Sequence, residues 1–118
     1  MLGYVMVGTN NLEKAIIFYD EVLKVLNLER NYKDEVCAGY TEKNGDGTIE
    51  FYVTKPVNMK EATNGNGTQV SFITSSRDIV DKFHEIGLKA GGKSEGAGGE
   101  RPEAVSYTHL RAHETMAH

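Results

Sequence analysis

A strand followed at once by a helix, in a pattern that occurs twice, constrains the fold of this chain more than any other feature. In the first copy, residues 2–8 (LGYVMVG) alternate as a strand does. Apolar residues then recur at helical spacing from Leu12 to Leu26. Asn10 is the expected cap of this helix, because Glu13 can bond back to it as the partner in a capping box.

Three further strands are predicted after this helix, which we expect to end at Asn27 in a left-handed conformation. The strands cover about 28–34, 36–42 and 48–54. Between the last two, the sequence Asn-Gly-Asp-Gly at 44–47 tolerates positive φ angles and predicts a hairpin turn. The first copy is therefore a β-α-β-β-β unit.

The second copy begins like the first but departs from it toward its end. Residues 68–74 alternate as a strand, and Ser75 or Ser76 can cap a second amphipathic helix. Five glycines fall within residues 91–99, which predicts a flexible loop. The residues after that loop show no hairpin signal and no alternating pair of strands. The second unit is therefore expected to be incomplete.

Composition limits the classes of protein to which the chain can belong. Its 118 residues carry 13 Lys and Arg against 17 Asp and Glu, a net charge of −4. An acidic chain of this size fits one domain and lacks the basic footprint of a nucleic-acid-binding protein. No stretch approaches the roughly 20 apolar residues that cross a bilayer, and no basic leader with an apolar block opens the chain. Cys37 has no partner for an internal disulfide. We expect a cytoplasmic protein that contacts neither nucleic acid nor membrane.

One motif matches a nucleotide-binding pattern in form only. Residues 87–94 (GLKAGGKS) fit the spacing of a phosphate-binding loop. Such a loop must leave a strand and enter a helix, so that backbone amides and the helix dipole meet the phosphate. This segment instead follows a helix, and we interpret it as the loop at that helix end.

The alternation of the strands divides the predicted sheet into two faces. Helices must cover the apolar face, which carries Val5, Val7, Ile49, Phe51, Val53, Val70 and Phe72. The opposite face carries aromatic and polar side chains that suit a small-molecule site, namely Tyr4, Met6, Glu50, Tyr52, Gln69 and Ser71. The alternative is an ordinary amphipathic sheet whose second face meets solvent or a partner chain.

The opening sequence at residues 3–29, GYVMVGTNNLEKAIIFYDEVLKVLNLE, resembles a known family. This is the glyoxalase, bleomycin-resistance and extradiol-dioxygenase group, the vicinal oxygen chelate superfamily. The resemblance covers about residues 1–103. It rests on the Asn-Leu helix start at Asn11-Leu12 and on the Phe-Tyr pair within the helix at Phe18-Tyr19. The helix ends in Leu26-Asn27, where the family usually has Leu-Gly.

The resemblance implies an α+β fold of paired βαβββ modules whose sheets curl around a cavity. Module one would span residues 1–56 and a partial module two residues 65–103, together forming a glyoxalase-like domain. Residues 104–118 do not resemble the strands that the family has there, and we expect an atypical C-terminal tail. The hypothesis that follows is a truncated or chimeric member with one complete and one incomplete module.

The resemblance also implies a possible metal site. In metal-using members, Ni²⁺, Zn²⁺, Mn²⁺ or Fe²⁺ is held by His, Gln and Glu and polarises substrate oxygens as a Lewis acid. Carried over by position, the ligands fall on Glu50, which matches, and on Gln69, where His is common. Tyr4 stands where His is usual, and the fourth ligand has no counterpart. In a catalytic protein, Glu50 is the expected ligand or base.

Three functions therefore stay open at the level of sequence. The first is a small-molecule-binding protein that acts as a metal-dependent lyase or dioxygenase. The second is a metal-free binding or sequestering module of the bleomycin-resistance kind, in which Glu50 and Gln69 bond a ligand that stacks on Tyr4 and Tyr52. The third is an inactive truncated chain. A homodimer is expected in each case, because family members often pair and pairing would cover exposed apolar surface.

Overall fold

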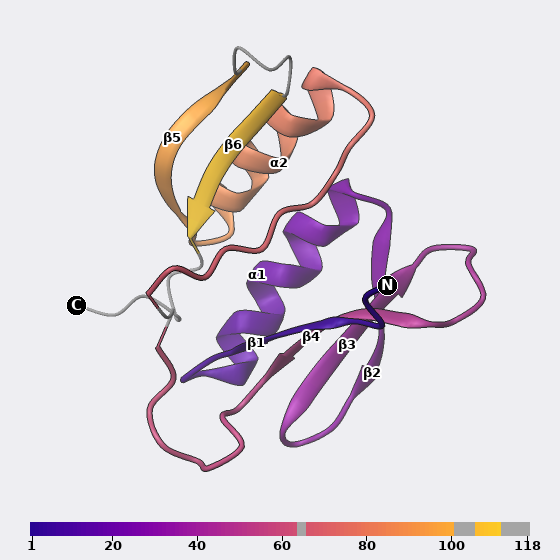
Figure 1. The fold of residues 1–118 in the computed structure, drawn as a ribbon, viewed down its shortest axis with the longest axis vertical. Coiled ribbons are helices and arrows are strands. Elements are labelled where there is room, and N and C mark those ends of the chain that lie inside the picture. The colour runs from indigo at the N-terminus through magenta and orange to yellow at the C-terminus, as the bar shows by residue number, and fades with distance from the viewer. Residues whose placement is uncertain (64–65, 101–105, 112–118) are drawn as a thin grey trace.

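The computed structural model describes residues 1–63, 66–100 and 106–111, and side chains within these ranges as far as Gly92. A sheet and a helix form one half of the molecule, and a second helix with a strand pair forms the other (Figure 1). In chain order, the elements are β1 (Val5–Gly8), α1 (Leu12–Val25), β2 (Leu28–Lys33), β3 (Cys37–Glu42), β4 (Ile49–Thr54), α2 (Arg77–Lys89), β5 (Lys93–Glu100) and β6 (Ser106–Arg111).

The first half is the complete βαβββ unit that the sequence predicts. Its sheet has the order β1-β4-β3-β2, in which β1 runs parallel to β4 and the other neighbours are antiparallel. The turn before β4 contains two residues with positive φ, Asn44 at 65° and Gly47 at 89°. The predicted hairpin and all three strands predicted after the helix are therefore confirmed. Strand β1 is shorter than the predicted 2–8.

Helix α1 follows the prediction except at its cap. The cap is Asn11, whose side-chain oxygen accepts from the Lys14 backbone N–H at 3.1 Å. Asn10 instead binds a distant loop, because its side chain accepts from the Ala62 N–H at 2.6 Å and donates to the Ala62 carbonyl at 3.2 Å. Asn27 has the predicted left-handed conformation, with φ of 64°.

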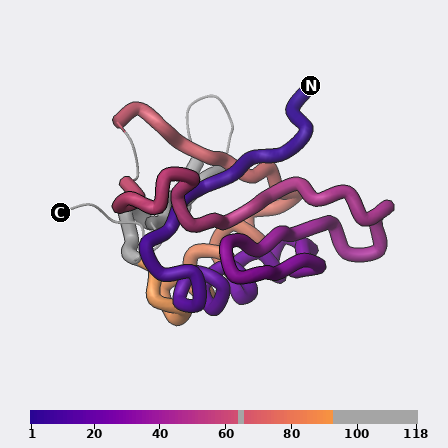
Figure 2. The backbone as a smooth tube through the Cα atoms, turned by 90° about the horizontal axis from the view of Figure 1, so that it is seen from below, coloured from indigo at the N-terminus to yellow at the C-terminus, as the bar shows by residue number. Residues whose placement is uncertain are grey.

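The core lies between α1 and one face of the sheet, which form two layers (Figure 2). Cross-strand partners share a face, and the buried partners Phe51 and Tyr40 stand opposite each other. Phe51 contacts the Tyr19 ring of α1, with ring centroids 5.2 Å apart. Val70 and Phe72 also pack on this core, as predicted. The apolar face of the sheet therefore meets helix α1.

The second half agrees with the predicted helix but not with the predicted strands. Ser76 caps α2 by accepting from the Ile79 N–H at 3.3 Å. Among the residues that the structure describes, 68–74 belong to no strand and pair with none, so the prediction of a strand there is wrong. The predicted loop at 91–99 is also wrong, since β5 occupies most of it.

Strand β6 lies in the region where the sequence shows no strand signal, and it pairs antiparallel with β5. Ladder hydrogen bonds come from the backbone, so a glycine-rich segment can pair without the β-branched residues that mark a strand in the sequence. Within the described residues, no helix combines the length and apolar character needed to cross a membrane.

Candidate functional site

The face of the sheet turned away from α1, called here the open face, carries one row of directly paired residues across all four strands. Met6 pairs with Tyr52, Tyr52 with Gly39, and Gly39 with Tyr32. Because direct partners project to the same side, three large side chains flank one glycine. The register therefore builds an aromatic surface with a gap above β3.

Tyr4 joins this surface just before β1 begins. Its ring meets the Tyr52 ring edge to face, with centroids 5.0 Å apart. Tyr4 remains 56 % exposed and Met6 45 % exposed. Tyr4, Met6 and Tyr52 were predicted as site residues, and the structure brings these three together.

Gly39 sets the depth of the open face. A Cβ atom at this position would lie 3.0 Å from two side-chain carbons of Ile49 and 3.1 Å from a ring carbon of Tyr52. Such distances are shorter than ordinary van der Waals contacts, so a side chain at this position would displace its neighbours. Ile49 and Tyr52 therefore lie over β3 because the residue beneath them is glycine.

The position of Ile49 corrects the sequence analysis, which placed it on the helix-covered face. Between β3 and β4 the register shifts, so that Tyr40 pairs with Phe51 but Thr41 pairs with Ile49. Glu50 is the extra residue of this bulge, and an extra residue reverses the alternation of the strand. Ile49 therefore shares the open face with Tyr52.

Glu50 itself lies at the bulge with its side chain exposed. Among the described residues, its carboxylate makes no hydrogen bond or ion pair. A bulge commonly redirects a side chain at the rim of a sheet. Glu50 is therefore available to an incoming group, and no neighbour fixes its orientation.

Gln69 and Ser71 belong to residues 68–74, which form no strand with the other described residues. The Gln69 amide donates to the Ser71 hydroxyl at 3.2 Å, and both side chains are exposed. Within the described part of the chain, neither bonds to a residue of the open face. Their predicted membership of the site stays a prediction.

Tyr32 belongs to the open face, although sequence reasoning missed it. A register shift between Arg30 and Tyr32 brings Tyr32 opposite Gly39. Its hydroxyl donates to Asp34 at 2.6 Å, and this bond is the largest cause that lowers the pKa of Asp34 to about 2. The signal that could have placed Tyr32 on this face is the short turn around Asp34, because the geometry of that turn sets which residues of β2 and β3 are paired.

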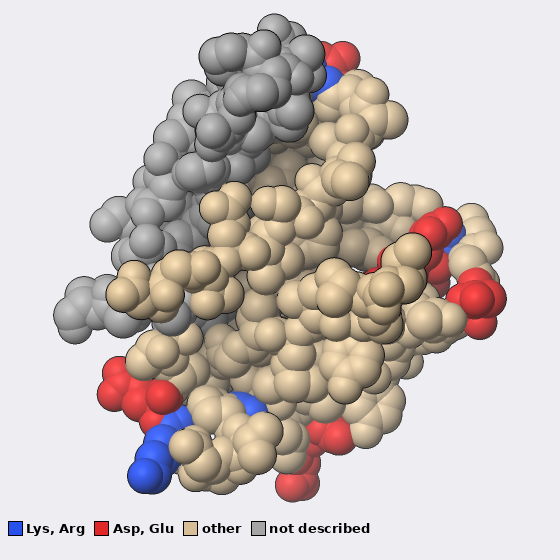
Figure 3. Space-filling model, in the orientation of Figure 1, with Lys and Arg blue, Asp and Glu red and all other residues tan. Residues whose placement is uncertain are grey.

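The basic residues of β2 point away from the open face. Arg30 pairs with Asp20 of α1 at 3.1 Å, and Lys33 pairs with Glu13 of α1 at 3.3 Å. In the orientation of Figure 1, the surface over the sheet is mostly free of charge and acidic groups lie toward its margins (Figure 3). The open face is therefore aromatic and largely uncharged.

The described donors do not fit a divalent metal. A tight site needs three or four strong ligands. The predicted positions supply one carboxylate at Glu50, one amide at Gln69, and the Tyr4 ring, which meets Tyr52 edge to face. The Gln69 amide is already engaged with Ser71. Within the described residues, no group of three His, Cys, Asp or Glu side chains could hold an ion.

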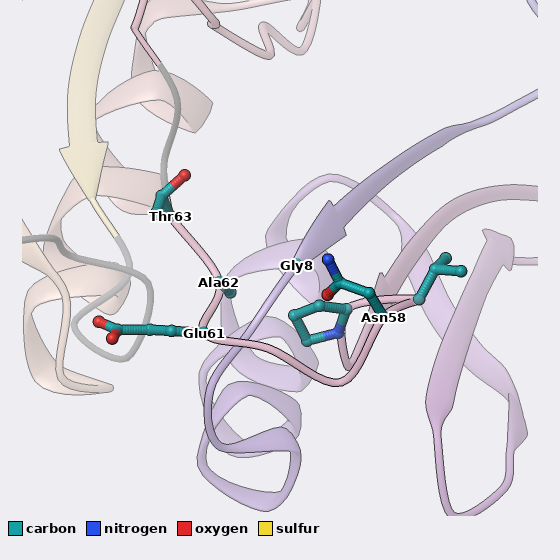
Figure 4. Close-up of a pocket in the computed structure, with 7 residues that line it drawn as sticks. Gly8, Asn58, Glu61, Ala62 and Thr63 are labelled. Atoms are coloured by element: carbon teal, nitrogen blue, oxygen red, sulfur yellow. The ribbon is translucent and has the colours of Figure 1, made fainter.

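An open depression of about 520 Å³ lies at the end of β1, and none of its lining residues was predicted as a site residue (Figure 4). Ala62, one of its lining residues, is held by the two hydrogen bonds to the Asn10 side chain. Most of its wall comes from the loop after β4, and its lining residues are Gly8, Pro56, Val57, Asn58, Glu61, Ala62 and Thr63.

Comparison with solved structures identifies the fold. The crystal structure of a glyoxalase/bleomycin resistance protein from Albidiferax ferrireducens matches with a TM-score of 0.87 and 31 % identity, over 98 % of this chain and 93 % of that one. A glyoxalase-related enzyme from Fulvimarina pelagi matches with a TM-score of 0.74 and 14 % identity, over 98 % and 83 % of the two chains.

A glyoxalase/bleomycin resistance protein/dioxygenase family enzyme from Burkholderia phytofirmans gives a TM-score of 0.72 and 16 % identity, over 97 % and 91 % of the chains. The two matches at 14 % and 16 % identity support the fold alone. No profile of a known family and no curated protein matches the sequence. The identity and coverage of the first match show that this chain belongs to the glyoxalase/bleomycin resistance protein family.

Proposed function

We propose that the protein binds a small, flat, uncharged organic molecule on the open face. The observation that carries this proposal is the paired row of Met6, Tyr52 and Tyr32, with Tyr4 against Tyr52. Large aromatic side chains held by a sheet offer contact area at little cost in conformational entropy. Their exposure on a monomeric surface is typical of a binding site.

In this proposal the aromatic rings supply contact area and the surrounding polar groups supply orientation. A flat ligand lies over Gly39, where no side chain rises from the sheet. The exposed Glu50 carboxylate accepts a hydrogen bond from the ligand at the rim. Gln69 and Ser71, on the segment that precedes α2, are proposed as further polar contacts.

The donor chemistry favours metal-free binding of the bleomycin-resistance kind over a metal-dependent lyase or dioxygenase. Glu50 is the one carboxylate of the proposed site, and Gln69 adds only a neutral amide. Chelator treatment tests this point. We expect ligand binding to be unchanged after treatment with ethylenediaminetetraacetate, and loss of binding that a divalent metal restores would contradict the metal-free proposal.

The binding proposal is tested with quinoline, an uncharged flat heteroaromatic molecule, by ligand-observed saturation-transfer NMR. We expect Tyr52→Ala to weaken quinoline binding about tenfold or more, because stacking on one aromatic side chain contributes roughly 1–3 kcal/mol. The matched control is Ile17→Ala, which removes a side chain that is 64 % exposed on α1. Equal quinoline binding by both variants, each shown to be folded, would contradict the proposal.

A further inference from the structure

The hydroxyl of Tyr32 is held differently from those of the other tyrosines on the open face. It donates to the Asp34 carboxylate at 2.6 Å. The rings of Tyr4 and Tyr52 contact each other, but within the described residues neither hydroxyl makes a hydrogen bond. Those two hydroxyls can therefore turn to donate or to accept, whereas the protein sets the direction of the Tyr32 hydroxyl.

The Asp34 carboxylate is itself fixed to the turn between β2 and β3. Its Oδ1 atom accepts from the N–H groups of Val36 and Cys37, each at 2.8 Å, and its Oδ2 atom accepts from Tyr32. These bonds lower the pKa of Asp34 to about 2, so the group is ionised at neutral pH. An ionised carboxylate has no proton to donate. The bond therefore runs in one direction only, from the phenol to the carboxylate.

This bond leaves the Tyr32 oxygen as a hydrogen-bond acceptor. A phenol hydroxyl has one proton to donate and lone pairs that accept. The bond to Asp34 uses the proton and raises the pKa of Tyr32, so the phenol stays protonated at neutral pH. Tyr32 is 44 % exposed and stands opposite Gly39 in the register, so its ring borders the place proposed for the ligand.

The charged groups nearby reinforce this polarity. The exposed Glu50 carboxylate, which makes no hydrogen bond or ion pair with the described residues, can only accept. The basic residues of β2 are engaged elsewhere, because Arg30 pairs with Asp20 and Lys33 pairs with Glu13 of α1. The margin of the open face therefore offers acceptors from Tyr32 and Glu50, and β2 directs its positive charges to the helix.

We infer that the open face selects flat ligands that carry an N–H or O–H donor at one edge, and that Tyr32 determines this selectivity. The inference rests on the proposed function. The Tyr32 oxygen accepts from the ligand, while Asp34, a positioning residue, keeps the phenol proton directed away from it. A ligand whose edge carries only an acceptor meets a lone pair there, so it binds less tightly.

Indole and quinoline are probes that separate the two polarities. Both are flat and uncharged at neutral pH, but indole carries an N–H donor and quinoline a ring nitrogen that only accepts. Titrations of the full chain, followed by backbone amide shifts, give a dissociation constant for each. Their ratio, quinoline over indole, is called here the donor selectivity. We expect Tyr32→Phe to lower it roughly threefold to tenfold, because the ring stays and one hydrogen bond is lost.

Asp34→Asn tests the positioning role, because it should reverse the phenol. The amide oxygen of the new side chain can keep the bonds to the N–H groups of Val36 and Cys37. Its NH₂ group then lies toward Tyr32 and donates to the phenol oxygen, so the phenol proton is free to point outward. We expect Asp34→Asn to bind quinoline more tightly than the wild-type chain does and to lower the donor selectivity further than Tyr32→Phe does.

Asp46→Asn is the matched control for this substitution. Asp46 accepts from the Thr48 N–H at 2.9 Å in the turn between β3 and β4, so the same chemical change is made in another turn of the sheet. We expect the donor selectivity of Asp46→Asn to equal that of the wild-type chain.

The outcomes separate this inference from the proposed function. If both probes bind and folded Tyr32→Phe keeps the wild-type donor selectivity, the inference is overturned and the proposed function stands. Quinoline binding by folded Asp34→Asn that is no tighter than in the wild-type chain would overturn the positioning role of Asp34. If Asp34→Asn does not fold, the result for Tyr32→Phe decides. Failure of both probes to bind the wild-type chain would contradict the proposed function and this inference together.

Discussion

At the scale of single residues, Asp34 joins the open face to the turn between β2 and β3. Its carboxylate accepts from the Tyr32 hydroxyl at 2.6 Å and from the N–H groups of Val36 and Cys37, each at 2.8 Å. These bonds favour the charged form and lower the pKa from 3.8 to about 2. Because the pKa of Asp34 is lower in the folded protein than in the unfolded chain, the charged carboxylate stabilises the fold. This stabilisation is complete at pH values above the unfolded pKa of 3.8, and it is lost as the pH falls through the folded pKa of about 2.

We therefore expect the Asp34 carboxyl to titrate near pH 2 in the folded protein, measured by carbon-13 NMR. Tyr32→Phe should move this pKa upward, because the largest cause of the shift is the tyrosine hydroxyl. Asp46, whose pKa is lowered chiefly by the Thr48 N–H, should not respond to that substitution. An Asp34 midpoint that stays the same in Tyr32→Phe would contradict the assignment.

Gly39 is the residue on which the shape of the open face depends most. We expect Gly39→Ala to destabilise the protein by about 1–3 kcal/mol, because the new methyl group overpacks against Ile49 and Tyr52. In an Ile49→Ala background the same change should cost less, since its closest neighbour has been shortened. Urea unfolding of the four proteins in this cycle measures the coupling, and strict additivity would show that Ile49 does not lie over Gly39.

At the scale of elements, the two helices should differ in their contribution to stability. Leu23 of α1 is fully buried, whereas Leu88 of α2 is 43 % exposed. We expect Leu23→Ala to lower the free energy of unfolding by about 2–5 kcal/mol. Leu88→Ala should lower it by less than about 1 kcal/mol. Similar losses in urea unfolding would show that α2 is packed as tightly as α1.

The elements also show which features the sequence could predict. Helix α1 and the hairpin between β3 and β4 follow from local signals, namely apolar spacing, Asn27 and the glycine-containing turn. The bulge at Glu50 has no such signal, because whether an extra residue fits depends on the partner strand. The same limit applies to residues 68–74, which alternate as a strand but have no described neighbour to pair with.

At the scale of the whole molecule, the two modules contribute unequally to the candidate site. Module one supplies a complete sheet and the aromatic open face, so Tyr4, Met6 and Tyr52 could be predicted from alternation alone. Tyr32 could not, because its face depends on a register shift in β2. The relation of Gln69 to this face depends on how module two packs, which local patterns do not encode.

We also propose that two copies of the chain form a dimer, because large apolar side chains are exposed. The exposed large apolar residues lie on several elements, including Tyr4 and Met6 at the open face and Ile73 on the segment before α2. Contact between two copies would remove part of this surface from water. The proposal that the protein works as a homodimer rests on this exposure.

Ligand binding on the open face can be tested by mapping backbone amide shifts during a quinoline titration. We expect saturable nitrogen-15 and proton shift changes centred on Met6, Gly39 and Tyr52. Changes centred instead on Gly8, Ala62 and Thr63, which line the depression at the end of β1, would contradict it. A titration that moves no amide of the four-stranded sheet would contradict it equally.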